Sequence, residues 1–329
     1  MPSADQVKAL ISSLSDGDEA HFYAVAMQIA AHEARLGHGK LADEIRSLID
    51  NAKSRPRMLP RAVIPLARPR GEASELLSVS YPNVRLNDMV LAAPTRKKLD
   101  RLVREQKAIQ LIRGRGLAPR RKVLLSGKPG TGKTLTASAL AGELGLQLFV
   151  VRLDGLITKF MGETAAKLRI VFETLAHTRG VYLFDEFDSI GSARDLSNDV
   201  GEIRRVVNSF LQMVEEDNSD SLIIAATNHI GILDHALFRR FDDVIQYELP
   251  DQVRIVETLK AKLGLFKTYK IQWAKIARMA RGLSFADITR ASEEAIKDAI
   301  IHDRTHVTHQ EIAHAIEDRK QSMSRKESN

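Results

Sequence analysis

The stretch Gly127-Lys128-Pro129-Gly130-Thr131-Gly132-Lys133-Thr134 decides the fold of this chain. Its spacing is that of the P-loop, G-x-x-x-x-G-K-[ST], in which glycines let successive backbone N–H groups face the phosphates of a nucleotide. The apolar run at 122–126 predicts a buried strand, and residues 135–144 predict a helix. A glycine turn can match this spacing by chance, but strand, loop and helix in this order favour a nucleotide site. We expect Lys133 to reach the β and γ phosphates and Thr134 to bind Mg²⁺.

Composition is that of an ordinary soluble globular protein, because 44% of the 329 residues are hydrophobic and 28% are charged. No apolar run approaches the roughly 18 residues that a membrane span needs, and the N-terminus lacks the pattern of a secretion signal. The chain has no cysteine, which excludes a disulfide framework and a thiolate metal site. We expect a cytoplasmic location and no membrane partner.

The net charge of +7 is unevenly distributed along the chain. Residues 54–122 hold 17 Lys and Arg against 5 Asp and Glu, a local excess of +12 (17 − 5). Such a segment contacts nucleic acid or an acidic partner surface, or it is a solvated linker. Tyr81 is the only aromatic residue in it, so few rings are present to stack on bases and nucleic acid is the less favoured partner.

The domain organisation follows from hydrophobic spacing and proline content. Apolar residues recur at helical spacing over 4–52 and predict a small bundle of about three helices, suited to binding a partner or protein substrate. Four prolines among arginines then predict an extended linker. We expect an N-terminal helical bundle at 1–53, a linker at 54–82, an α/β nucleotide-binding core at 83–250 and a helical C-terminal segment at 251–329, which the family resemblance described below identifies as an ATPase core and a lid.

A second cluster of polar residues follows the apolar run 180–184, which predicts another buried strand. Asp185 and Glu186 come directly after it, about fifty residues beyond the P-loop, which is the Walker B arrangement. Asp185 is expected to orient Mg²⁺, and Glu186 to polarise the attacking water as a general base. On its own, an acidic strand end that caps a helix would have the same sequence. The residues expected to contact the nucleotide are Gly127, Lys128, Pro129, Gly130, Thr131, Gly132, Lys133, Thr134, Leu135 and Asp185, and the expected metal ligands are Thr134 and Asp185.

With the next segments, the chain resembles the AAA ATPases over residues 83–319. Residues 221–228 are similar to the family's fourth core strand, which implies that Asn228 orients the attacking water beside the γ-phosphate. Residues 233–242 are similar to the family's second region of homology, where arginines reach the ATP of a neighbouring subunit. The resemblance gives Arg239 and Arg240 this role. Because the two arginines are adjacent here, whereas many members separate them around a glycine, the sequence leaves open which one is the principal finger.

The resemblance extends to a pore loop and to the lid. Residues 159–164 resemble pore loop 1, which implies that Phe160 and Met161 grip an extended polypeptide, although Phe160 could instead be a core residue. Residues 282–288 resemble the family's lid motif G-x-S-G-A-D-[LI], with Phe285 in place of the second glycine. Helices are expected at 253–263, 271–281, 285–304 and 310–319.

Taken with the resemblance, these features predict a P-loop core with a parallel five-stranded sheet flanked by helices, a helical lid and a small N-terminal bundle. The expected function is a ring-forming ATPase, a homo-oligomer expected to be a hexamer, that uses ATP and Mg²⁺ to unfold, remodel or translocate protein through a central pore. Since the chain has no protease motif, any degradation needs a separate protease. The alternatives are a DNA-acting ATPase, such as a loader or transposition-type helper, and an ATP-driven assembly switch.

Overall fold

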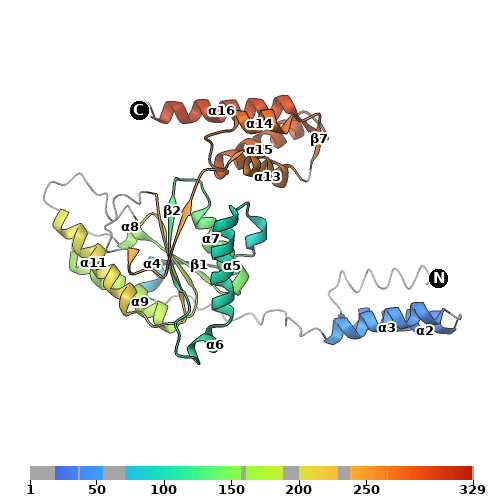
Figure 1. Ribbon diagram of the computed structural model, residues 1–329, viewed down its shortest axis with the longest axis horizontal. Helices are drawn as coiled ribbons and strands as arrows, with labels where there is room; N and C mark the ends of the chain where they lie inside the picture. Colours follow the sequence, from blue (N-terminus) through green and yellow to red (C-terminus); the bar gives the residue numbers. More distant parts are fainter. Residues whose placement is uncertain are drawn as a thin grey trace. The chain divides into compact units, whose positions relative to one another are not determined.

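The computed structural model describes residues 19–35, 38–54, 71–156, 161–187, 200–228, 238–264 and 266–327. The chain divides into two compact units, Met1–Ala67 and Arg68–Asn329, each described by itself. Figure 1 labels their helices and some of the strands.

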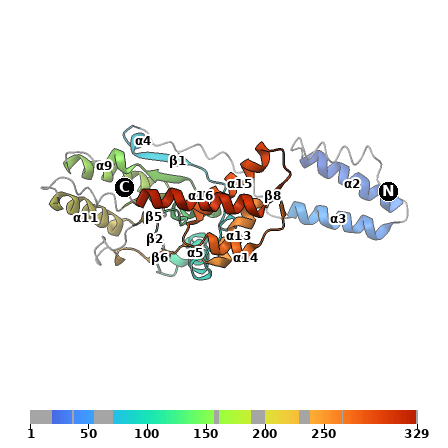
Figure 2. The same cartoon turned by 90° about the horizontal axis from the view of Figure 1, so that it is seen from above.

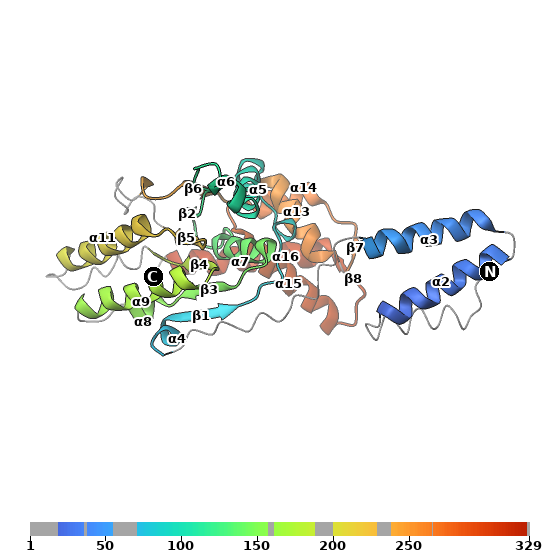
Figure 3. The ribbon, with the colours of Figure 1, turned by 90° about the horizontal axis from the view of Figure 1, so that it is seen from below.

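The N-terminal unit contains the helices α2 (Glu19–Arg35) and α3 (Gly39–Ser54), which pack side by side as a hairpin (Figure 3). Apolar side chains of both helices are buried, among them Val25, Ile29 and Ile49. The sequence predicts a bundle of about three helices. The structure describes two of them, α2 and α3, and the first predicted segment lies outside the described residues.

A central sheet organises the second unit and contains six strands within the described residues, in the order β1-β3-β4-β5-β2-β6. The last five pair in parallel, which confirms the predicted α/β fold. The strands are β1 (Leu77–Ser80), β2 (Lys122–Gly127), β3 (Leu148–Val151), β4 (Val181–Phe184), β5 (Leu222–Thr227) and β6 (Asp243–Tyr247).

The antiparallel edge strand β1 corrects the predicted linker at 54–82. β1 pairs with β3 from Leu77↔Val151 to Ser80↔Leu148, so this part of the segment belongs to the core sheet. The short helix α4 (Ala73–Leu76) precedes it, and Leu76 and Leu77 are buried. These apolar contacts hold the segment against the sheet, although the prolines before it favour an extended linker.

Helices cover both faces of the sheet, which is why every residue of β4 and β5 is buried. Alternate strand residues face opposite sides: Tyr182 and Phe184 pack with α9 (Met161–His177) and α11 (Val200–Glu216). Leu183 packs on the other side with α5 (Ala93–Lys107) and α7 (Lys133–Leu144) (Figure 1). Short elements complete the core, namely η1 (Leu86–Asp88), α6 (Ile109–Arg113) and α8 (Leu153–Leu156).

The C-terminal part of the second unit has its own apolar core, built from the four helices that the sequence predicts, with shifted ends. The helices are α13 (Gln252–Leu263), α14 (Trp273–Met279), α15 (Phe285–Ile301) and α16 (His309–Glu327), the last of which is the longest here (Figure 2). The sequence did not predict the parallel pair β7 (Lys267–Tyr269) and β8 (His306–Thr308), because three residues are too few for a strand pattern. Across the described parts of the chain, no helix is long and apolar enough to cross a membrane.

Candidate functional site

The P-loop connects β2 to α7 and is closed by Thr131, whose hydroxyl donates a hydrogen bond to Lys128 O at 2.7 Å. α7 begins at Lys133, so the N–H groups of its first turn and the positive end of its dipole lie next to the loop. A helix start of this kind is an anion-binding geometry. Of the predicted contact residues at 127–135, six line one cavity at this helix start, Thr131 lines a second one, and Gly127 and Lys128 line neither.

Lys133 joins the P-loop to the neighbouring strand. Its buried ammonium donates to Gly127 O at 2.7 Å, to Lys128 O at 3.1 Å and to Asn228 Oδ1 at 2.8 Å. Asn228 follows β5, and β5 pairs in parallel with β2, so the two strands end at the same edge of the sheet. The amide and the lysine therefore meet although they are 95 residues apart in the sequence.

The two carboxylates after β4 lie at the same edge. Thr134 Oγ1 donates to Asp185 Oδ2 at 2.5 Å, which brings together the two predicted metal ligands. Glu186 has an exposed side chain and a left-handed backbone with φ of 51°, a conformation that costs a non-glycine residue about 1–3 kcal/mol. The next residue stabilises this turn, because Phe187 N donates to Ala226 O at 2.9 Å and the Phe187 ring is fully buried.

These side chains line a cavity of about 520 Å³. One wall belongs to the core and the other to the lid. The lid residues Lys262, Thr289, Arg290 and Glu293 were missed by the sequence analysis, since isolated polar residues on helices carry no motif. The lining is Pro129, Gly130, Gly132, Lys133, Thr134, Leu135, Asp185, Glu186, Asn228, Lys262, Phe285, Ala286, Thr289, Arg290 and Glu293.

A second cavity of about 140 Å³ is lined by Thr131 and by residues from α5, β6 and the lid. Tyr247 lies in its wall and braces the P-loop helix: its hydroxyl is 2.6 Å from Thr136 Oγ1, which itself lies 2.9 Å from Gly132 O. Burial raises the pKa of Tyr247 to about 12. No sequence signal identified this residue, because a tyrosine at the end of a strand is unremarkable until its neighbours are known.

The lid contacts the P-loop directly. Ser284 caps the N-terminus of α15, and Ala286 N donates to Gly130 O at 3.1 Å. Gly130 allows this approach, because a Cβ at this position would overlap Ser284 Oγ and its φ of 74° is left-handed. The contact couples the position of the lid to the phosphate loop.

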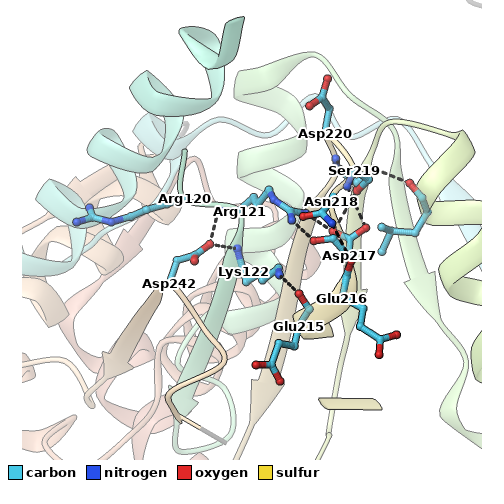
Figure 4. A network of polar contacts seen from close by, with 12 residues as sticks. Arg120, Arg121, Lys122, Glu215, Glu216, Asp217, Asn218, Ser219, Asp220 and Asp242 are labelled. Atoms are coloured by element: carbon cyan, nitrogen blue, oxygen red, sulfur yellow. Dashed lines mark hydrogen bonds and ion pairs between the residues drawn. The ribbon is translucent and has the colours of Figure 1, made fainter. Parts of the chain in front are cut away.

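Arg239 and Arg240 lie in different surroundings, and neither lines the cavity around Lys133. Arg240 forms an ion pair with Glu215 at the end of α11. Asp242 accepts hydrogen bonds from the backbone N–H groups of Arg121 and Lys122, each at 2.8 Å (Figure 4). Arg239 is exposed and makes no hydrogen bond or ion pair with any residue that the structure describes.

The sequence matches the family described as "ATPase family associated with various cellular activities (AAA)" over residues 123–249. It is also 37% identical over 320 residues to "Uncharacterized AAA family ATPase y4kL" of Sinorhizobium fredii, covering 97% of this chain and 96% of that protein. This chain belongs to the AAA ATPases. It therefore binds ATP and has ATPase activity.

Two other relatives of this AAA ATPase are longer proteins. "ATP-dependent zinc metalloprotease FtsH" of Helicobacter pylori is 32% identical over 257 residues, which is 75% of this chain and 41% of that protein. "Proteasome-activating nucleotidase" of Pyrococcus horikoshii is 35% identical over 252 residues, which is 73% of this chain and 62% of that protein. The chain thus spans less than two thirds of the length of each.

The predicted pore residues of the AAA ATPase are not part of the described site. Phe160 lies outside the described residues. Met161 begins α9, and its side chain also lies outside them. Their role in gripping a polypeptide therefore stays a prediction.

Seven residues of the basic segment at 54–122 form ion pairs within the described part of the AAA ATPase itself. These arginines and lysines pair with carboxylates on the same chain, so their charge is not all available to a polyanion. The pairs are Arg85–Glu143, Arg96–Asp100, Lys98–Asp243, Arg101–Glu105, Arg113–Asp220, Arg120–Glu105 and Arg121–Asp217.

Proposed function

We propose that this AAA ATPase hydrolyses ATP at the cavity around Lys133 and couples hydrolysis to the remodelling of protein substrates. The supporting observation is that Lys133, Asp185 and Asn228, which follow β2, β4 and β5 in the sequence, all line one cavity. Lys133 and the N-terminus of α7 would hold the phosphates, while Glu186 would accept a proton from water that Asn228 orients. Catalysis would thus come from positioning and from charge stabilisation.

Mg²⁺ is the cofactor that this site fits. Thr134 and Asp185 offer a hydroxyl and a carboxylate, the hard oxygen ligands that Mg²⁺ prefers. Within the described residues, no group of three or more His, Asp or Glu side chains could hold a metal ion. Two protein ligands suit Mg²⁺, which takes its remaining ligands from water and nucleotide phosphates and would there neutralise phosphate charge.

A ring would complete the site. AAA ATPases generally oligomerise, and neither Arg239 nor Arg240 lines the cavity of its own chain. We therefore assign an arginine from this pair to the ATP of the neighbouring subunit, where it would stabilise charge on the phosphoryl group being transferred. A homo-hexamer is the proposed assembly.

The proposed output is translocation or unfolding of protein through the centre of that ring. Similarity to proteins named "ATP-dependent zinc metalloprotease FtsH" and "Proteasome-activating nucleotidase" supports a role in handling protein substrates. Phe160 and Met161 would contact the polypeptide. A separate protease is the proposed effector if the product is degradation, and the N-terminal helices would bind the substrate or partner.

Two variants test this function. Glu186→Gln is expected to bind ATP and assemble but to hydrolyse it slowly, so that stalled rings retain substrates for identification by pull-down. Phe160→Ala is expected to hydrolyse ATP at close to the wild-type rate while losing remodelling of a bound substrate. Remodelling by Phe160→Ala at the wild-type rate would contradict the pore proposal and leave the ATPase proposal intact.

The nucleic-acid alternative makes a different prediction. A DNA-acting ATPase would bind DNA in a strongly salt-sensitive manner, and DNA would stimulate its turnover. The internal ion pairs of the basic segment favour the protein-remodelling proposal over this one. An assembly switch would instead show negligible turnover in the assembled wild-type ring.

A further inference from the structure

Four phenylalanine rings connect the turn that carries Glu186 to the helices on one face of the sheet. Phe210 of α11 is at their centre: its ring centroid lies 4.5 Å from that of Phe187, 4.8 Å from that of Phe184 and 5.9 Å from that of Phe172. The side chains of Phe184, Phe187 and Phe210 are fully buried. Phe210 therefore packs against both the last residue of β4 and the residue that follows Glu186.

The backbone turn at Glu186 depends on its surroundings. Its φ of 51° is left-handed, and a residue other than glycine keeps such a conformation only where the structure around it imposes it. On one side, Asp185 accepts a hydrogen bond from Thr134 Oγ1 at 2.5 Å. On the other side, Phe187 is held by its N–H group, which donates to Ala226 O at 2.9 Å, and by its buried ring.

The direction of the Glu186 carboxylate is set by this turn. The side chain is exposed, and no residue that the structure describes forms a hydrogen bond or ion pair with its carboxylate. A carboxylate without a side-chain partner points where its own backbone directs it. The packing of Phe187 against Phe210 is thus one of the contacts that decide where the carboxylate lies.

Phe210 reaches this turn without reaching the nucleotide site. It lines neither the cavity around Lys133 nor the smaller cavity beside it. It belongs to the apolar core on the α9 and α11 face of the sheet, whereas the P-loop helix α7 packs on the opposite face. A change to the Phe210 ring therefore leaves the groups that would hold the phosphates in place.

We propose that Phe210 is a positioning residue for ATP hydrolysis. Through Phe187, its ring holds the strained turn that directs the Glu186 carboxylate toward the attacking water. The inference rests on the proposed role of Glu186 as general base. Its consequence is that loss of the Phe210 ring lowers kcat and leaves the affinity for ATP unchanged, because the ring acts on the base and not on the nucleotide.

Phe210→Leu tests this inference by steady-state ATPase kinetics and by calorimetric titration with Mg²⁺ and ATP. Leucine keeps most of the apolar volume but removes the ring contact with Phe187. Because a displacement of about 1 Å costs up to about 100-fold in rate, kcat should fall about 10- to 100-fold. The KM and the dissociation constant for ATP should stay within about twofold of wild type.

Phe149→Leu is the matched control. Phe149 is also fully buried in the same apolar core, and its ring stacks on that of Tyr182 with centroids 4.5 Å apart. It packs beside Gly180 at the beginning of β4, however, whereas Phe210 packs at the end of β4. Both variants should lower the melting temperature, and only Phe210→Leu should lower kcat at a temperature where both are folded.

A double variant separates positioning from a general loss of packing. If Phe210 acts through Glu186, then Phe210→Leu should cause no further fall in single-turnover hydrolysis when Glu186→Gln is already present. A merely structural role would lower the rate in both backgrounds. Phe187→Leu, which removes the other ring of the same contact, should show the same loss of kcat and serves as the test if Phe210→Leu does not fold.

The outcomes distinguish the inference from the role on which it rests. Turnover of Phe210→Leu within about twofold of wild type, or an equal fall in Phe149→Leu, would overturn the inference. A further fall in the double variant would do the same. Glu186→Gln alone should bind ATP and hydrolyse it slowly, and turnover at the wild-type rate by that variant would instead overturn the assignment of the general base.

Discussion

Replacing Arg121 with methionine removes the positive charge from a buried network at the beginning of β2. The guanidinium of Arg121 pairs with the Asp217 carboxylate and also donates to Asp217 O (Figure 4). The side chains of Arg121 and Asp217 are only 8% and 5% exposed. Methionine has a similar length and fills the apolar part of the space, so the variant mainly removes the charge and its hydrogen bonds.

The expected loss of stability follows from the interactions that Asp217 keeps after Arg121 is replaced. Asp217 would keep the hydrogen bonds from Ser219 N and Ser219 Oγ, both at 3.2 Å, but its buried charge would lose its paired guanidinium and keep only a longer-range attraction to Lys122. Breaking a buried pair by removing one partner costs about 3–5 kcal/mol. For a unit of this size, that corresponds to a fall in the melting temperature of roughly 6–20 °C. Arg121→Met combined with Asp217→Asn should recover part of the loss, because the orphaned charge is then removed as well.

Urea denaturation followed by circular dichroism measures these differences. Lys297→Met is the control, since Lys297 pairs with Glu294 on the surface and its side chain is 61% exposed. This control should unfold at the wild-type midpoint. If Arg121→Met lost less than about 1 kcal/mol, or if the double variant lost as much as the two single changes together, the buried pair would not hold the network together as described.

Three further predictions concern the site and its supports. Tyr247→Phe should lose about 1 kcal/mol at neutral pH with the hydrogen bond to Thr136. The pKa of Tyr247 is about 12 in the folded state and about 10 in the unfolded state, so the unfolded state loses this proton first. The wild-type protein therefore loses stability as the pH rises from about 10 to about 12, whereas the phenylalanine variant does not. Denaturation near pH 8 and pH 11 should therefore show the deficit of the phenylalanine variant shrinking, and a constant deficit would refute this. Gly142→Ala should lower the melting temperature although alanine favours helices, because a Cβ at this position would overlap Val84 O; a raised melting temperature would contradict the contact. Asn228→Ala should bind ATP but turn it over about 100-fold more slowly, and wild-type steady-state rates would exclude its orienting role.

The sequence predicted the elements whose patterns repeat over many residues or whose motifs fix a spacing. The P-loop, the strands that end at Asp185 and Asn228, and the lid helices have such signals, and parallel strands necessarily bring their ends to one edge. The edge strand β1 was missed because its four residues follow a proline-rich segment and are too few to establish alternation.

Other features depend on contacts between distant segments. Arg240 pairs with Glu215, 25 residues away, whereas Arg239 pairs with none of the described residues, and nothing in the local sequence indicates this difference. Phe285 stands out in the sequence as a departure from the family pattern. That it lines both cavities beside the P-loop follows only from the contact between the lid and Gly130.

The hydrogen bonds of Lys133 have a consequence for how binding energy is measured. A phosphate that reaches this ammonium competes with Gly127 O, Lys128 O and Asn228 Oδ1, which already satisfy it. The affinity observed for a nucleotide is thus an exchange free energy, smaller than the full attraction between phosphate and lysine. When the phosphate takes the place of Asn228 on Lys133, the amide of Asn228 would become free to bind the attacking water. Binding of the nucleotide and orientation of that water would then occur in the same step.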